Sequence, residues 1–176
     1  MIVVLVDGCS GAGKSTVAAE LAGRGLASID ADEDPSLCHW VDADGRFVEL
    51  PAEADLAWFD RHRWEWDPVR LDEVISAAGS ATLFVCGNAA NDTDLLDRFD
   101  RVLLLEIDEP TMLARVDDPH RRDNDFGRAG DEREFLRRSL PGYEAQMRSA
   151  GAIPIDATQP LNQVVDAVVV LAEAAR

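Results

Sequence analysis

Lysine is almost absent from this chain. Lys14 is the only lysine among the 17 basic residues, while aspartate and glutamate together number 34, for a formal net charge of −17. Such an acidic chain argues against nucleic acid as the main partner, because binding a phosphate backbone requires a basic face. Every other basic residue is arginine, so Lys14 indicates a site that needs a compact ammonium rather than a planar guanidinium.

Cysteines and long apolar runs are also scarce. Three widely spaced cysteines (Cys9, Cys38, Cys86) form neither a disulfide framework nor a zinc pattern, which favours a cytoplasmic protein. No run reaches the roughly 18 apolar residues of a membrane span, so no membrane partner is expected. The opening MIVVLV is too short for a signal-peptide core and predicts a strand. We expect a single domain, residues 1–176, as a monomer or homodimer.

Strand and helix patterns alternate along the sequence. Apolar runs predict strands at residues 2–7, 26–29, 81–86, 101–107 and 152–155, and helical spacing predicts helices at residues 14–23, 51–63, 67–78, 92–99, 109–116, 131–149 and 161–175. Pro141-Gly142 is expected to disturb the helix at 131–149. The alternation predicts an α/β fold of three layers, in which helices cover both faces of a five-stranded parallel sheet.

The first predicted strand runs into GCSGAGKS, residues 8–15, which has the spacing of a P-loop. Glycines allow the backbone N–H groups to surround a phosphate, and the following helix adds its N-terminal dipole. The motif predicts Lys14 at the β- and γ-phosphates and the Ser15 hydroxyl on Mg²⁺, so ATP and Mg²⁺ are the expected cofactors. The expected nucleotide-binding residues are Gly8, Cys9, Ser10, Gly11, Ala12, Gly13, Lys14, Ser15 and Thr16.

Carboxylates gather just beyond the second predicted strand, in SIDADEDP. Ligands of open α/β sheets bind at the carboxyl ends of strands, so Asp30 and Asp32 are expected to face the phosphate site. If this segment is extended, two residues that are two positions apart point the same way. One carboxylate suits a Mg²⁺ ion and the other suits an attacking hydroxyl. We assign Asp30 to the metal and Asp32 to catalysis.

These motifs resemble those of the small P-loop kinases of the adenylate kinase/shikimate kinase superfamily, with the layout of the shikimate and gluconate kinase branch. That branch pairs a P-loop with an Asp-x-Asp, here Asp30-Ala31-Asp32, and has no acidic residue ending the third strand, here TLFVCGN. An arginine-bearing lid and a Pro-x-Tyr-Glu helix follow, matched by Arg121-Arg122 and residues 141–144. The resemblance implies an ATP-dependent phosphotransferase that moves the γ-phosphate of ATP to a hydroxyl or phosphate of a small metabolite.

The same comparison shows two departures from shikimate kinases. Gly87 is followed by Asn88 where those enzymes carry three glycines, and Ser139 stands where they carry a carboxylate-binding arginine. Shikimate is therefore not the expected acceptor. The main alternative function is a P-loop NTPase that hydrolyses nucleotide as a switch for a protein partner.

Two further segments complete the expected site. Residues 117–130 lack an apolar period and predict a lid, in which Arg121 and Arg122 either clamp the transferring phosphoryl group or form a solvated basic patch. Residues 33–66, expected to be a small helical acceptor-binding region with a hairpin at Asp44-Gly45, hold all four tryptophans. Stacking on these rings suits a nucleoside-like acceptor, and a small aromatic core is the equally weighted alternative.

Overall fold

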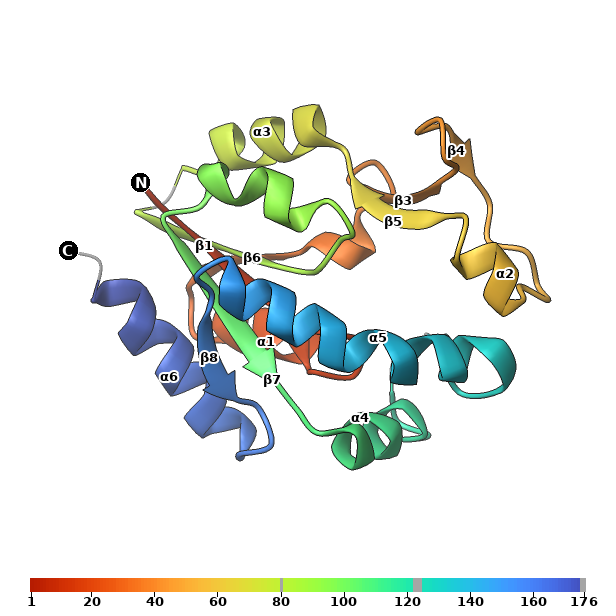
Figure 1. The fold of residues 1–176 in the computed structure, drawn as a ribbon. Helices are drawn as coiled ribbons and strands as arrows, with labels where there is room; N and C mark the ends of the chain where they lie inside the picture. Colours follow the sequence, from red (N-terminus) through yellow and green to blue (C-terminus); the bar gives the residue numbers. More distant parts are fainter. Residues whose placement is uncertain (80, 122–124, 175–176) are drawn as a thin grey trace.

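A computed structural model describes residues 1–79, 81–121 and 125–174 (Figure 1). Its centre is a parallel sheet with the strand order β2-β6-β1-β7-β8. The strands are β1 (Ile2–Asp7), β2 (Ala27–Asp30), β6 (Thr82–Cys86), β7 (Arg101–Glu106) and β8 (Ile153–Asp156). The prediction of an α/β fold with a five-stranded parallel sheet is confirmed. Arg122 lies outside the described residues.

Helices lie on both faces of the sheet, which gives the three expected layers (Figure 1). The helices of the described residues are α1 (Lys14–Gly23), α2 (Leu56–Phe59), α3 (Pro68–Ala77), α4 (Glu109–Val116), α5 (Gly130–Ser149) and α6 (Leu161–Glu173), with the 3₁₀ helices η1 (Ala31–Glu33) and η2 (Asp92–Arg98), and α2 lies beside the second sheet (Figure 1). Helix α5 continues through Pro141 as one element, so the expected disturbance does not break it. Among the described residues, no helix is long and apolar enough to cross a membrane.

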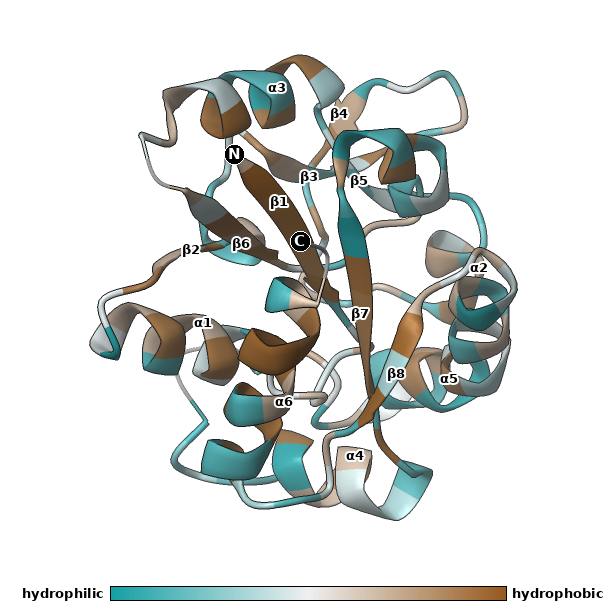
Figure 2. Cartoon of the chain, turned by 90° about the vertical axis from the view of Figure 1, so that its left-hand side faces the viewer, coloured by the Kyte–Doolittle hydropathy of each residue, from teal (hydrophilic) through white to brown (hydrophobic). Residues whose placement is uncertain are grey.

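Strand β1 belongs to two hydrophobic cores, as its uninterrupted apolar sequence predicts (Figure 2). Val4 and Val6 lie in the core that includes residues of α1 and α6. Val3 and Leu5 lie in the core that includes residues of α3 and η2. Successive side chains of a strand point to opposite faces, so one short strand anchors both helical layers.

The segment at residues 33–66 differs most from expectation. It forms a three-stranded antiparallel sheet, β4-β3-β5, from β3 (Cys38–Val41), β4 (Phe47–Val48) and β5 (Arg63–Trp66). The hairpin through Asp44-Gly45 is confirmed by the pairing of β3 with β4. The helix predicted at 51–63 is wrong: α2 is a single turn, because strand pairing with β3 begins at Arg63 and overrides the local helical pattern.

The strand order has a switch point at β1. β2 and β6 lie on one side of β1, and β7 and β8 lie on the other. Parallel sheets bind ligands outside the carboxyl ends of strands at such a switch point. The β3–β5 sheet and α2 lie at this end of the molecule, away from both termini (Figure 1).

Candidate active site

The P-loop follows β1 directly and is shaped by glycines. Gly11 and Gly13 have φ values of 84° and 100°, in the region that favours glycine. At Gly8 the reason is packing, since a Cβ there would lie 2.8 Å from the Ala12 Cβ and 2.9 Å from the carbonyl oxygen of Leu105. The loop can therefore curl tightly enough for its N–H groups to converge on an anion.

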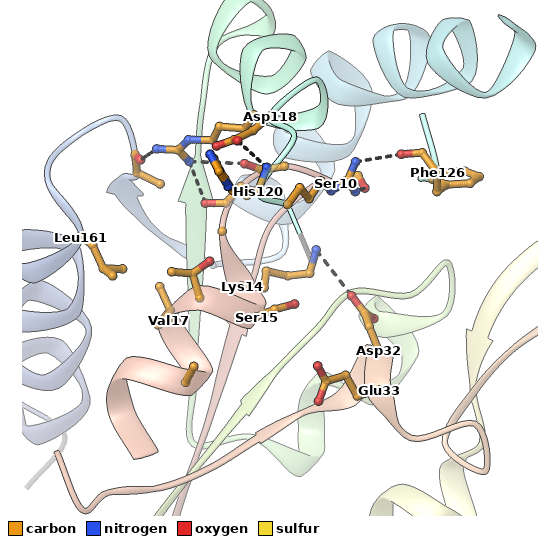
Figure 3. A pocket seen from close by; sticks show the side chains of 18 of the residues that line it. Ser10, Lys14, Ser15, Val17, Asp32, Glu33, Asp118, His120, Phe126 and Leu161 are labelled. Atoms are coloured by element: carbon orange, nitrogen blue, oxygen red, sulfur yellow. Dashed lines mark hydrogen bonds and ion pairs between the residues drawn. The ribbon is translucent and has the colours of Figure 1, made fainter. Parts of the chain in front are cut away.

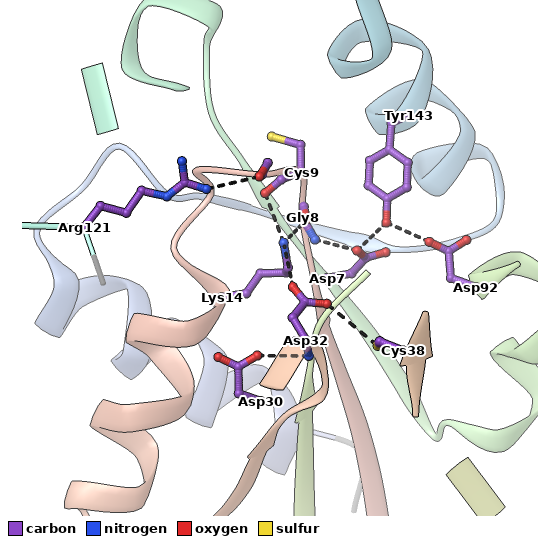
Figure 4. Close-up of polar contacts among 11 residues, drawn as sticks. Asp7, Gly8, Cys9, Lys14, Asp30, Asp32, Cys38, Asp92, Arg121 and Tyr143 are labelled. Atoms are coloured by element: carbon purple, nitrogen blue, oxygen red, sulfur yellow. Dashed lines mark hydrogen bonds and ion pairs between the residues drawn. The ribbon is translucent and has the colours of Figure 1, made fainter. Parts of the chain in front are cut away.

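Lys14 is buried at the centre of this loop, with 6% of its side chain exposed. Its ammonium donates hydrogen bonds to the carbonyl oxygens of Gly8 at 2.8 Å and Cys9 at 3.2 Å, and it lies 3.8 Å from Asp32 Oδ2 (Figure 4). The sequence prediction that Lys14 and Asp32 share one site is therefore consistent with the geometry. A positive charge fixed in this position can neutralise phosphate charge without reorganising.

Asp30 and Asp32 lie at the predicted edge, but they are not on one extended segment. Asp30 ends β2, and its Oδ1 accepts a hydrogen bond from the backbone N–H of Asp32 at 3.2 Å. This cap winds the chain into η1, so the expectation of two parallel side chains on a strand is wrong.

The other oxygen of Asp30 fits a metal ligand. Asp30 Oδ2 is buried and has no hydrogen-bond partner within the described residues. A hard cation such as Mg²⁺ binds oxygen and keeps several waters, so this carboxylate and the Ser15 hydroxyl are the residues that would hold it. In the described part of the chain, the Asp30 region included, no cluster of three or more His, Cys, Asp or Glu side chains is placed to hold a metal.

Asp32 connects the P-loop to the second sheet. The Trp64 side chain and the Asn88 backbone lower the pKa of its carboxyl, and Cys38 Sγ lies 4.0 Å from its Oδ1. The surrounding protein raises the pKa of Asp32 by removing water, while the nearby Lys14 charge lowers it. About a third of the side chain is exposed, so this carboxylate can still accept a hydrogen bond from an incoming hydroxyl.

The lid reaches back over the P-loop through Arg121. The guanidinium donates to the carbonyl oxygen of Phe126 at 2.9 Å and lies 3.5 Å from Ser10 Oγ. Partial burial lowers its pKa. Arg121 is thus placed beside the phosphate-binding loop, and it is not part of a solvated surface patch.

The P-loop, Asp32 and Arg121 line a pocket of about 1140 Å³, and Asp30 is not among the described residues that line it (Figure 3). Its walls are Ser10 to Val17, Ala19, Asp32, Glu33, Leu50, Arg115, Asp118, His120, Arg121, Asp125, Phe126, Glu132, Ala157, Gln159, Leu161 and Val164. Seven of the predicted nucleotide-binding residues, Ser10 to Thr16, lie on these walls. Gly8 and Cys9 lie beneath the loop, where their carbonyls hold Lys14.

Arg115 has a structural position that the sequence did not reveal. Its guanidinium donates to the carbonyl oxygens of Gly11 at 3.3 Å, Ala12 at 3.1 Å and Ala157 at 2.6 Å. It therefore ties the P-loop to the chain that follows β8. An arginine on the helix before the lid was the only sequence signal for this tether.

A buried acidic cluster directly below the P-loop was also missed. The Tyr143 hydroxyl lies in hydrogen-bond contact with Asp7 Oδ1 and 2.7 Å from Asp92 Oδ2, and Asp7 accepts the Gly8 N–H at 2.5 Å (Figure 4). Both carboxyl groups are fully buried. Burial and the neighbouring Asp92 raise the pKa of Asp7 to about 7. The sequence signal for this cluster was Asp7, a polar residue at the end of an apolar strand.

The four tryptophans have two different environments. Trp66 is 1% exposed and belongs to the core, whereas Trp40, Trp58 and Trp64 are half-buried. Trp40 packs against the other two with ring centroids 5.0 and 5.7 Å away, and Phe126 of the lid lies 6.4 Å from it. None of the four is among the residues that line the pocket in the described chain.

Comparison with known proteins supports the fold. No protein-family profile and no curated protein matches this sequence. A solved shikimate kinase from Acinetobacter baumannii, in complex with shikimate, matches with a TM-score of 0.64 and 18% identity over 100% of this chain and 95% of its own. A deoxyadenosine kinase from M. mycoides matches with a TM-score of 0.59 and 14% identity over 98% and 100%.

A third structure, a sugar kinase from Janibacter sp. HTCC2649, matches with a TM-score of 0.56 and 21% identity over 97% of this chain and 93% of its own. Each likeness spans nearly the whole of both chains. The protein therefore has the fold of the P-loop small-molecule kinases, of the adenylate kinase/shikimate kinase type.

Proposed function

We propose that the protein is a kinase that transfers the γ-phosphate of ATP to a hydroxyl or phosphate group of a small metabolite. The observation that carries this proposal is the position of Lys14. Its ammonium lies between the P-loop carbonyls and Asp32, and Arg121 lies beside the same loop at Ser10. One buried cation, one acceptor-side carboxylate and one lid arginine meet in a single pocket. The kinase fold supports the same reading.

Each residue has a role in this proposal. The P-loop N–H groups and Lys14 bind and neutralise the phosphates. Asp30 and Ser15 would hold Mg²⁺, which supplies positive charge to phosphate oxygens when bound. Asp32 accepts the hydrogen bond of the acceptor hydroxyl and orients it. Arg121, on the lid, adds charge at the transferring group and helps to exclude water.

Transfer is favoured over regulated hydrolysis because one chain supplies the lysine, the carboxylate and the lid arginine that transfer needs. An NTPase switch relies on water as the acceptor, whereas here the Asp32 carboxyl lies between Lys14 of the P-loop and Cys38 of the second sheet. The three similar structures are kinases of shikimate, deoxyadenosine and a sugar, which are all small compounds with hydroxyl groups. We propose an acceptor of this general class.

A nucleoside-like compound is one candidate acceptor. Phe126 lines the pocket, and its ring centroid lies 6.4 Å from that of Trp40, which in turn packs against Trp64. Aromatic rings at this end would favour a flat ligand. The free, buried cysteines support a reducing compartment, which we propose to be the cytoplasm.

An ATP-consumption screen over nucleosides, nucleotides, sugars and hydroxy acids tests the proposal. We expect one acceptor class to accelerate ADP release, with new phosphate on the acceptor in a mass spectrum. Lys14→Ala should abolish this transfer, and Lys14→Arg should restore little of it, because a guanidinium does not fit the site of a compact ammonium. ADP release that yields only inorganic phosphate with every compound would support the hydrolase instead.

A further inference from the structure

The buried acidic cluster below the P-loop has no role in the proposed transfer reaction. Tyr143 of α5 lies between Asp7, at the end of β1, and Asp92, at the start of η2 (Figure 4). Both carboxyl groups are fully buried, and Asp7 Oδ2 and Asp92 Oδ1 have no hydrogen-bond partner within the described residues. Two buried carboxyl groups that contact the same hydroxyl cannot both ionise at low cost.

The number of hydrogens in this cluster indicates that it holds a proton. The Tyr143 hydroxyl donates one hydrogen, yet it contacts an oxygen of each carboxyl group. If one carboxyl group is protonated, it can donate to the hydroxyl oxygen while the hydroxyl donates to the other carboxylate. Asp7 and Asp92 then titrate as one coupled pair around a single proton.

Gly8 connects this cluster to the lysine of the P-loop. Its N–H donates to Asp7 Oδ1 at 2.5 Å, and its carbonyl oxygen accepts a hydrogen bond from the Lys14 ammonium at 2.8 Å (Figure 4). The positive charge of Lys14 lowers the pKa of Asp7, whereas the negative charge of Asp92 raises it. A change in the net charge around Lys14 is therefore felt by the carboxyl group of Asp7.

The other titratable groups around Asp7 are neutral near pH 7. Burial raises the pKa of the Cys9 thiol to about 11, and burial holds the pKa of Tyr143 well above its ordinary value. Burial and Asp92 raise the pKa of Asp7 to about 7, although the Tyr143 hydrogen bond lowers it. The proton of the cluster is thus half lost near neutral pH.

We propose that the proton held between Asp7 and Asp92 is linked to nucleotide binding, with Asp7 as the positioning residue that connects it to the P-loop through Gly8. This inference rests on the proposed function, which places nucleotide phosphates at Lys14. The phosphates bring negative charge and offset the charge of Lys14, and both effects favour the protonated form of Asp7. Binding then takes up a proton from the solvent, and loss of that proton weakens nucleotide binding by the same factor.

The direction and size of the effect follow from this linkage. Well below pH 7 the cluster is already protonated, so binding takes up no proton there. At pH 7 about half of the free molecules hold the proton, so uptake reaches at most about half a proton per nucleotide. Affinity should therefore fall as pH rises above 7, and uptake of half a proton corresponds to roughly a threefold fall per pH unit.

Calorimetry with ADP and excess Mg²⁺ measures the uptake, because ADP supplies phosphates that the protein cannot transfer. Titrations at pH 7 in buffers of different ionisation enthalpy give the number of protons taken up. Asp7→Asn keeps an oxygen for the Gly8 N–H but cannot titrate, so the difference from this variant cancels any protons bound or released by ADP itself. We expect the wild type to take up roughly half a proton more than Asp7→Asn, and its affinity to fall roughly threefold relative to that variant between pH 7 and 8.

Two further variants separate a linked proton from a structural effect. Tyr143→Phe removes the hydrogen bond that lowers the pKa of Asp7, so the uptake should move to higher pH. Asp60→Asn, at an exposed aspartate, removes the same charge and should behave as the wild type. Melting curves verify that each variant folds, and if Tyr143→Phe does not, the comparison with Asp7→Asn decides.

Equal proton uptake by the wild type and Asp7→Asn, or an affinity difference between them that is constant with pH, would overturn the inference while leaving the kinase proposal intact. Failure of the wild-type protein to bind ADP at any of these pH values would instead refute the proposed function itself.

Discussion

Replacing Asp7 with asparagine should change how the stability of the fold depends on pH. The Tyr143 hydroxyl has one hydrogen to donate, yet it contacts carboxyl oxygens of both Asp7 and Asp92. Satisfying both contacts requires a second proton, on one of the carboxyl groups. Asp7 Oδ2 and Asp92 Oδ1 are also buried and have no partner within the described residues, so full ionisation of the pair is costly.

The magnitude follows from the pKa of Asp7, which rises from an ordinary value of 3.8 to about 7 in the folded chain. Between pH 3.8 and about 7, Asp7 holds its proton in the folded state and has lost it in the unfolded state. Stability from this group is therefore fully present below pH 3.8 and is lost as pH rises to 7. Between pH 5 and 8 the loss is about 2 to 3 kcal/mol, at about 1.4 kcal/mol per pH unit. That is a large part of the 5–15 kcal/mol typical of a domain.

Urea unfolding, followed by tryptophan fluorescence at pH 5, 6, 7 and 8, measures this loss. Asp7→Asn has no proton to lose, so its stability relative to the wild type should rise by about 2 to 3 kcal/mol across this range. Tyr143→Phe should be destabilising, and more so at high pH, because it removes the donor shared by both carboxylates. Asp60→Asn, at an exposed aspartate, is the control for charge removal alone. A stability difference between Asp7→Asn and wild type that is constant with pH would refute the reasoning.

The remaining predictions concern the two aspartates, the lid and the aromatic rings. Asp30→Asn should raise the Mg²⁺ concentration needed for half-maximal activity, whereas Asp32→Asn should lower kcat with little change in ATP affinity; the opposite pattern would reverse their roles. Arg121→Ala should lower kcat by roughly 10²-fold or more and raise the share of ATP lost to water, as product analysis would show, and unaltered partition would argue against a lid role. An acceptor and an ATP analogue together should change tryptophan emission more than the sum of each alone, which an additive response would contradict.

The conformation of the P-loop segment could be predicted because its signals are local. A P-loop needs glycines at fixed positions between a strand and a helix, and the sequence shows all of these together. The buried strand β1 and the lone lysine are likewise visible in composition alone. The structure then places Lys14 and Asp32 3.8 Å apart, although 18 positions separate them in the chain.

The segment at residues 33–66 was predicted less well because its contacts are not local. Residues 51–63 carry a helical pattern, yet the segment is set by the pairing of β5 with β3 and by ring contacts across it. Phe59 stacks on Phe135 of α5 with centroids 4.7 Å apart. Phe135, far along the chain, thus contributes to the conformation of residues 51–63. The periodicity of that segment alone carries no information about this contact.

Asp32 shows how the P-loop and the segment at residues 33–66 act on one another. Its Oδ2 lies 3.8 Å from the Lys14 ammonium, while Trp64 of β5 and the backbone of Asn88, just beyond β6, lower its pKa. Gly87 must be glycine for this approach, because a Cβ there would lie 2.7 Å from the Ala31 Cβ and 2.9 Å from Trp66. Under the proposed function, an acceptor that displaced the second sheet would change the surroundings of the carboxylate that lies beside Lys14. We therefore expect the sheet at residues 38–66 to couple acceptor binding to the phosphate site.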